Sequence, residues 1–235
     1  MKRILVAATA VALAAGLSTT ANAASYSVTV STGHPTPAAG FITTNVDPFT
    51  GSDTATAHFT YTGDINFDNE TAQNNGPSGD TNSAFGFSTS NISLYSGLGT
   101  VSGGVADFST VDTFLSSSGS ASGFQYGSWY RFDLGSLAAG TTLTITHDDG
   151  VSLYQGSTNL GGTNAGPTVK TTDVVALATG GDTVLYYSRQ NGTPSVLEVT
   201  ATPPVFDVPV PEPTSLALLG AALFGFGALR RRCRA

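Results

Sequence analysis

Two adjacent carboxylates stand out in the stretch THDDGVSLYQGS, residues 146–157. Asp148 and Asp149 precede Gly150, and alternating apolar residues flank them on both sides. Two carboxylates at the tip of a hairpin can face a hard cation that loop carbonyls also ligate, so one hypothesis is a calcium site. The alternative is structural: Asp149-Gly150 forms a type I′ turn between two strands, with Asp148 solvated beside it.

A second run of oxygen-bearing side chains occurs in GDINFDNE, which contains Asp64, Asn66, Asp68 and Glu70. Ligands at alternate positions resemble the start of an EF-hand loop. The match fails twice, because position six is Asn69 instead of glycine and position twelve is Asn75 instead of glutamate. The remaining interpretations are another kind of calcium loop or a polar transition from strand to loop.

Catalytic motifs are missing from the sequence. It contains no G-x-S-x-G nucleophile motif and no phosphate-binding loop. The three histidines, His34, His58 and His147, lack the spacing of a transition-metal site. Two glycosidase carboxylates would be hard to recognise among scattered acidic residues, so a hydrolase of extracellular polysaccharide stays open as an alternative. We expect a protein that is not an enzyme.

Period-two alternation of apolar residues predicts the elements that position these side chains. Residues 24–201 show no helical period, and turn-forming residues separate short alternating runs. This pattern predicts an all-β domain, an antiparallel jelly-roll-like sandwich, with long loops at 33–48 and 68–83. The predicted strands lie at 25–30, 55–61, 85–87, 92–95, 129–134, 141–146, 151–154, 169–177, 183–188 and 195–200.

The two ends of the chain carry targeting signals. Residues 1–23 have a basic start, an apolar centre and an Ala21-Asn22-Ala23 cleavage site, which is typical of a secretory signal peptide. At the other end, a proline-rich spacer at 202–210 precedes an uncharged apolar span at 214–229. The span has 16 residues, where about 20 usually cross a bilayer, so it predicts a short transmembrane helix. The arginines that follow it would stay in the cytoplasm.

Removal of both ends leaves a strongly acidic body. Of the nine basic residues only Arg131, Lys170 and Arg189 remain, against fifteen acidic residues when cleavage falls before Glu212, which gives a net charge of −12. Such a surface repels nucleic acid and anionic lipid and suits divalent cations or neutral sugars. The single cysteine, Cys233, lies in the C-terminal segment, so the body has neither a disulfide nor a thiolate metal site.

The C-terminal segment resembles the PEP-CTERM sorting signal of Gram-negative bacteria. The resemblance rests on three parts in order: Pro211-Glu212-Pro213, the apolar span, and the cluster Arg230, Arg231 and Arg232 within 230–234. It implies that residues 211–235 are a sorting signal removed by the membrane enzyme exosortase. The protein would then contact the inner membrane only transiently through this helix and end at the cell surface or outside the cell.

The second half of the body resembles protective-antigen-type β-sandwich domains. The similarity covers THDDGVSLYQGS and LATGGDTVLYYSRQNGTPSVLEVT. It implies that Asp148 and Asp149 match an aspartate pair that can hold calcium and, in some adhesins, helps to bind a sugar. Together the two resemblances lead to the hypothesis of an exported surface or matrix protein, associated with exopolysaccharide or biofilm, that binds calcium and extracellular polysaccharide.

Overall fold

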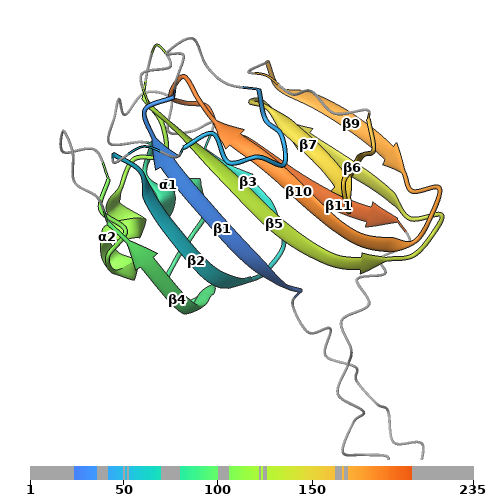
Figure 1. Ribbon diagram of the computed structural model, residues 1–235, viewed down its shortest axis with the longest axis horizontal. Helices are drawn as coiled ribbons and strands as arrows, with labels where there is room; N and C mark the ends of the chain where they lie inside the picture. Colours follow the sequence, from blue (N-terminus) through green and yellow to red (C-terminus); the bar gives the residue numbers. More distant parts are fainter. Residues whose placement is uncertain are drawn as a thin grey trace, which may run out of the picture.

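The computed structural model describes residues 24–35, 42–49, 51, 53–69, 80–99, 106–121, 123, 126–161, 166 and 169–202. These residues form two antiparallel sheets (Figure 1). The seven-stranded sheet has the order β4 (Ile92–Leu98), β2 (Ala55–Thr62), β1 (Ser25–Gly33), β5 (Gly127–Leu137), β10 (Gly181–Arg189), β7 (Val151–Gln155) and β8 (Thr158–Asn159). The four-stranded sheet has the order β3 (Asn66–Asp68), β11 (Val196–Thr202), β6 (Thr142–His147) and β9 (Thr171–Ala176).

The core lies between the two sheets, where one face of each strand is buried. On β1 the side chains of Tyr26, Val28 and Val30 point inward, as their alternation predicts. Leu143 and Ile145 of β6, in the four-stranded sheet, belong to the same buried cluster. The predicted all-β sandwich is therefore confirmed.

Aromatic side chains fill much of this core. Phe67 of β3 lies 4.8 Å from Phe85, 5.0 Å from Phe87 and 5.9 Å from Phe132, measured between ring centroids. All four residues are at most 1% exposed. Such tilted pairs add stabilisation beyond the burial of their area.

The predicted strand at 85–87 is wrong, because Phe85 ends a short helix. Helix α1 (Asn82–Phe85) begins at Thr81, whose side chain accepts a hydrogen bond from the amide of Ala84, and ends at Gly86 with φ 132°. A helix α2 (Val111–Ser116), which was also not expected, begins with a reciprocal capping box between Thr110 and Thr113. At residues 82–85 the caps therefore favour a helical turn, although the alternation of Phe85 and Phe87 alone favours a strand.

The sandwich has two distinct ends. Ser25, Thr142 and Thr202 lie together at one end, because β1 starts there, β6 starts there, and Thr202 of β11 pairs with Thr142. The opposite end holds the start of β7, the end of β10 at Arg189, and His147, which pairs with Leu197. We call these the terminal end and the polar end.

The targeting segments lie outside the described residues. This applies to the predicted signal peptide at 1–23, to the spacer beyond Thr202 and to the sorting signal at 211–235. Neither helix of the described part is long and apolar enough to cross a bilayer. The predicted span at 214–229 is not among the residues covered by that finding.

Candidate functional site

The aspartate pair lies in a connection between the two sheets. β6 pairs with β11 and β9, whereas β7 pairs with β10 and β8, so residues 148–150 cross from one sheet to the other. Gly150 does not adopt positive φ. The predicted hairpin turn is therefore wrong. The strand before the aspartate pair and the strand after it belong to different sheets, whereas a two-residue turn joins neighbouring strands of one sheet.

Both aspartates turn inward, with 5% of each residue exposed. Asp148 Oδ1 accepts hydrogen bonds from the Val196 amide at 2.8 Å and from the Tyr187 hydroxyl at 3.2 Å. Asp149 Oδ2 accepts one from the Gln190 amide at 2.9 Å. The pair thus fixes the start of β11 and the end of β10. These hydrogen bonds engage Asp148 Oδ1 and Asp149 Oδ2.

Burial makes ionisation of these two carboxyl groups unfavourable. Loss of hydration raises the pKa of Asp148 to about 6, although the hydrogen bonds from Val196 and Tyr187 favour its charged form. Burial and then the negative charge of Asp148 raise the pKa of Asp149 well above its usual value. At neutral pH the pair therefore favours either a retained proton or a bound cation.

This shift predicts a pH dependence of stability without calcium. A carboxyl whose folded-state pKa exceeds its unfolded value stabilises the fold below the unfolded value of about 4, and this contribution is lost as the pH rises through about 6. Two pH units correspond to about 3 kcal/mol. The unfolding free energy of the wild type should therefore fall from pH 4 to pH 7.5 relative to Asp148→Asn/Asp149→Asn, as thermal melts in a calcium chelator would show. A wild type that gains stability over this range relative to the variant would contradict the assignment.

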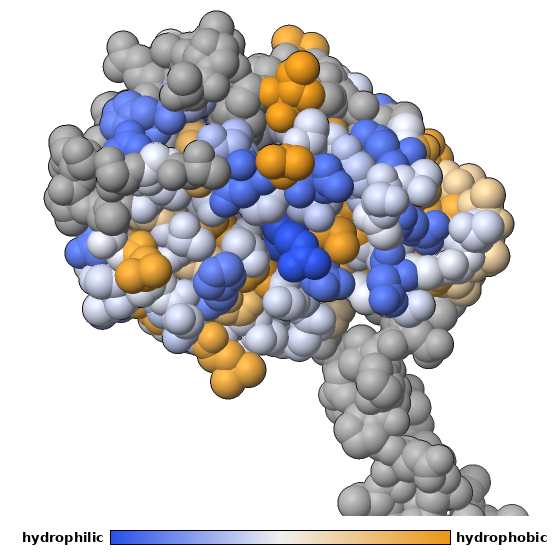
Figure 2. Space-filling view, in the orientation of Figure 1, coloured by the Kyte–Doolittle hydropathy of each residue, from blue (hydrophilic) through white to orange (hydrophobic). Residues whose placement is uncertain are grey.

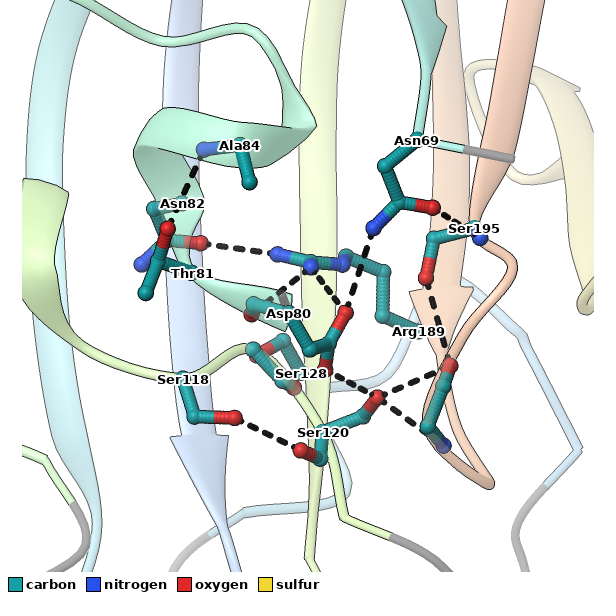
Figure 3. Close-up of polar contacts among 12 residues, drawn as sticks. Asn69, Asp80, Thr81, Asn82, Ala84, Ser118, Ser120, Ser128, Arg189 and Ser195 are labelled. Carbon is teal, nitrogen blue, oxygen red and sulfur yellow. Dashed lines mark hydrogen bonds and ion pairs between the residues drawn. The ribbon is translucent and has the colours of Figure 1, made fainter. Parts of the chain in front are cut away.

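A buried arginine lies at the same polar end (Figure 3). Arg189 is fully buried and forms an ion pair with Asp80 through Nη2. Its Nη1 donates to Asn82 Oδ1 at 3.0 Å and to the Tyr130 hydroxyl at 3.1 Å. The guanidinium also lies 4.3 Å above the centroid of the Phe85 ring. Helix α1 therefore supplies both polar and aromatic partners to the guanidinium.

Short polar residues complete this network. Ser120 donates to Asp80 Oδ2 at 2.6 Å and accepts from the Gly192 amide at 3.1 Å. A Cβ atom at Gly119 would lie 2.1 Å from Arg189 Nη1, so only glycine leaves room for the guanidinium there. Ser120 thus ties the buried ion pair to the connection between β10 and β11.

Sequence reasoning missed the Arg189–Asp80 network. It places acidic side chains at the solvent-facing surface, yet Asp80, Asp148 and Asp149 are all at most 5% exposed. The available signal was Arg189 itself, one of three basic residues in the body, directly after the apolar run VLYYS. The polar end thus holds three buried carboxyls and one buried guanidinium, which leaves an excess of acidic groups there.

His147 stabilises the crossover at residues 148–150 through both of its ring nitrogens. Its Nδ1 lies 2.5 Å from the carbonyl oxygen of Asp149, and its Nε2 lies 3.2 Å from Asp173 Oδ2. The ring is fully buried, so it holds the backbone of Asp149 against the edge strand β9. The other histidines have different partners: His34 lies 2.7 Å from Asp53, and His58 lies 3.0 Å from the Thr29 hydroxyl.

The second calcium hypothesis concerns residues in β3 and directly before it. Asp64, Asn66 and Asp68 are exposed, while Ile65 and Phe67 between them are buried, so this stretch has one polar face. Asp68 also lies 3.7 Å from the amine of Lys170. Glu70 lies outside the described residues. Among those described, no three His, Cys, Asp or Glu side chains converge to hold a metal ion.

Comparison with solved structures gives two β-rich neighbours. One is a "Crystal structure of PA14 domain of MpAFP Antifreeze protein", with TM-score 0.37 and 10% identity over 76% of this chain and 81% of that one. The other is a "PA14 sugar-binding domain from RTX adhesin", with TM-score 0.39 and 11% identity over 77% of this chain and 93% of that one. Such a likeness shows nothing about function.

The C-terminal segment gives the informative match. No protein with a curated description resembles the chain. Residues 209–232 match the PEP-CTERM protein-sorting motif, which covers the Pro-Glu-Pro sequence, the apolar span and the arginines at 230–232. The predicted sorting signal is thus confirmed, and the chain is an exported protein that carries a PEP-CTERM motif for processing by exosortase.

Proposed function

We propose that this protein is a non-catalytic component of the cell surface or extracellular matrix, associated with exopolysaccharide or biofilm. We further propose that its sandwich domain binds calcium through Asp148 and Asp149 and binds carbohydrate with the help of that ion. The observation that carries the proposal is the inward-facing aspartate pair. The hydrogen bonds described above engage Asp148 Oδ1 and Asp149 Oδ2, and the proposed ion would be held by the other two oxygens of the pair.

Calcium fits the chemistry of the pair. The two carboxylates are adjacent and buried, and the buried Arg189 at this end of the sandwich already forms its ion pair with Asp80. A divalent cation would neutralise the excess charge, whereas the alternative at neutral pH is retained protons. Calcium accepts carboxylate, carbonyl and water oxygens in irregular shells, while magnesium needs a tighter octahedron. The site should therefore prefer calcium.

Carbohydrate binding follows from the small number of protein ligands. Calcium takes six to eight oxygen ligands. Two aspartates supply at most four, and the described residues offer no third acidic side chain at this point. Open coordination positions can accept the neighbouring hydroxyls of a sugar, which also brings no charge to a body of net charge −12. This chemistry favours a binding protein over a hydrolase.

Calcium should raise the melting temperature of the exported protein. A ligand that binds only the folded state stabilises it by about 2.7 kcal/mol at a hundredfold excess over Kd. Each kcal/mol moves the melting temperature of a domain this size by about 2–4 °C, so we expect a rise of several degrees. Asp148→Asn/Asp149→Asn should abolish the rise, because asparagine keeps an oxygen acceptor for the amides of Val196 and Gln190 but loses the charge. The matched control Asp64→Asn/Asp68→Asn should keep it. An equal calcium shift in the Asp148/Asp149 variant would refute the site.

Binding to a glycan array tests the carbohydrate part. The exported protein should retain glycans with calcium and release them in a chelator, and Asp148→Asn/Asp149→Asn should bind as weakly as the chelated wild type. Unchanged glycans after long incubation would support a non-catalytic role. Shortened glycans would support the polysaccharide hydrolase instead.

A further inference from the structure

The connection between β10 and β11 contains an asparagine directly followed by a glycine, Asn191-Gly192. Both residues adopt positive φ, 66° and 84°, a conformation that asparagine and glycine tolerate better than other residues. Figure 2 shows one face of the domain, on which the described surface is mostly pale and blue and hydrophobic patches stand separately. Asn191 is itself an exposed residue at the polar end, just beyond Arg189, so its side-chain amide is open to water.

An exposed Asn-Gly pair can undergo deamidation. The main-chain nitrogen of Gly192 attacks the side-chain carbon Cγ of Asn191, and a succinimide ring forms. The proton of that nitrogen leaves with the side-chain amino group as ammonia. Water then opens the ring on one side or the other and gives aspartate or isoaspartate. Glycine favours the attack because it has no Cβ atom to shield its nitrogen, and water is the single co-reactant.

Two hydrogen bonds restrain both reacting groups. Asn191 Oδ1 accepts a hydrogen bond from the amide of Gly123 at 3.1 Å, which fixes the carbon that would be attacked. The amide of Gly192 donates to Ser120 Oγ at 3.1 Å, which keeps the proton on the attacking nitrogen and directs the N–H bond toward Ser120. The attack therefore requires the hydrogen bond to Ser120 to break first.

The buried ion pair strengthens this restraint. Ser120 donates its own proton to Asp80 Oδ2 at 2.6 Å, and Asp80 pairs with Arg189 (Figure 3). Hydrogen bonds in such a chain polarise one another, so the carboxylate makes the oxygen of Ser120 a better acceptor. Asp80 and Ser120 are each 2% exposed, so water has little access to replace Ser120 as the partner of the Gly192 amide.

We propose that Asn191 is a site of spontaneous deamidation, and that Ser120 is the positioning residue that sets its rate. The isoaspartate product adds a methylene carbon to the main chain between Gln190 and Gly192. The amide of Gln190 holds Asp149 Oδ2, so this insertion displaces a hydrogen bond of the buried aspartate pair. Deamidation therefore loosens the polar end as the exported protein ages. The inference does not depend on calcium binding by the pair.

The wild-type protein gives the first test. Peptide mapping by mass spectrometry follows the conversion of Asn191 during incubation at mildly alkaline pH, both in the folded exported protein and in urea. Asn75-Gly76 is the other Asn-Gly pair of the chain, and in urea both pairs should convert at similar rates. In the folded protein Asn191 should convert several-fold more slowly than in urea. Equal rates at Asn191 in the two conditions would overturn the proposal.

Ser120→Ala gives the second test. Loss of one hydrogen bond should raise the rate at Asn191 in the folded protein about two- to tenfold. Hydrogen exchange of the Gly192 amide should also become faster, because its acceptor is removed. Exchange in the core strands β1 and β6 should match that of the wild type, which reports an intact fold.

Ser128→Ala is the matched control, because Ser128 is another buried serine of the polar end whose hydroxyl bonds to Gly119 and Thr32 instead. This variant should deamidate at the wild-type rate. An unchanged rate in Ser120→Ala, or an equal rise in Ser128→Ala, would refute the role of Ser120. Exchange that becomes faster throughout β1 and β6 together with the rate at Asn191 would refute it as well.

Discussion

Arg189→Met is expected to lower the free energy of unfolding by about 3–5 kcal/mol, because it removes one partner of a buried ion pair and leaves the other uncompensated. Asp80 is 2% exposed and, among the described residues, would keep Ser120 and Asn69 as side-chain partners. The hydrogen bonds to Asn82 and Tyr130 would also be lost. Melting temperature should fall by about 6–20 °C.

Arg131→Met is the matched control. Arg131 pairs with Asp133 at 3.3 Å, but both side chains are more than one third exposed, so removal should change stability by about 0–1 kcal/mol. A double variant, Arg189→Met/Asp80→Leu, removes both members of the buried pair and should recover part of the loss. A melting temperature equal to that of the wild type in the single variant would contradict a structural role for the network.

Replacement of Pro211, Glu212 and Pro213 by alanine should abolish removal of the C-terminal segment. The sorting motif matches residues 209–232, and Glu212 is the one charged residue of this match before the apolar span. Without cleavage the apolar span should keep the protein in the membrane fraction. The wild type should lose the arginine cluster and leave that fraction. Intact mass and fractionation in a host that carries exosortase would measure both.

Pro203→Ala/Pro204→Ala provides a control for the loss of prolines, because both lie in the spacer upstream of the motif. This variant should be processed like the wild type. If secreted wild-type protein retained Arg230, Arg231 and Arg232, the assignment of the sorting signal would fail. Normal processing of the Pro-Glu-Pro variant would show that the enzyme reads another feature.

The strands could be predicted because their burial has period two. Ala57 and Phe59, for example, face the core on β2 while His58 between them is exposed. The same rule failed for Phe85 and Phe87, because capping by Thr81 and the positive φ of Gly86 are local events that alternation does not report. A period in hydrophobicity shows which side chains are buried. It does not show whether a strand or a short helical turn buries Phe85 and Phe87.

The candidate site could be predicted only in part. Asp148 and Asp149 were identifiable as an adjacent acidic pair, but their inward orientation depends on which sheet each flanking strand joins. That assignment is a long-range property: Val196 and Gln190, whose amides hold the carboxylates, lie more than forty positions further along the chain. Arg189 and Asp80 are 109 positions apart, so no local pattern joins them.

The position of Thr202 at the terminal end has a mechanical consequence. A ligand bound as proposed at Asp148 and Asp149 would pull on the polar end of β6, whereas attachment of the processed chain through the residues that follow Thr202 would pull on the terminal end of β11. The two strands are antiparallel neighbours, paired from Leu197 with His147 to Thr202 with Thr142. Hydrogen bonds in such a pair run perpendicular to the strands, so tension along the strands loads all of them in shear at once instead of opening them one after another. The topology would therefore let the domain keep the proposed ligand under the drag of a moving fluid.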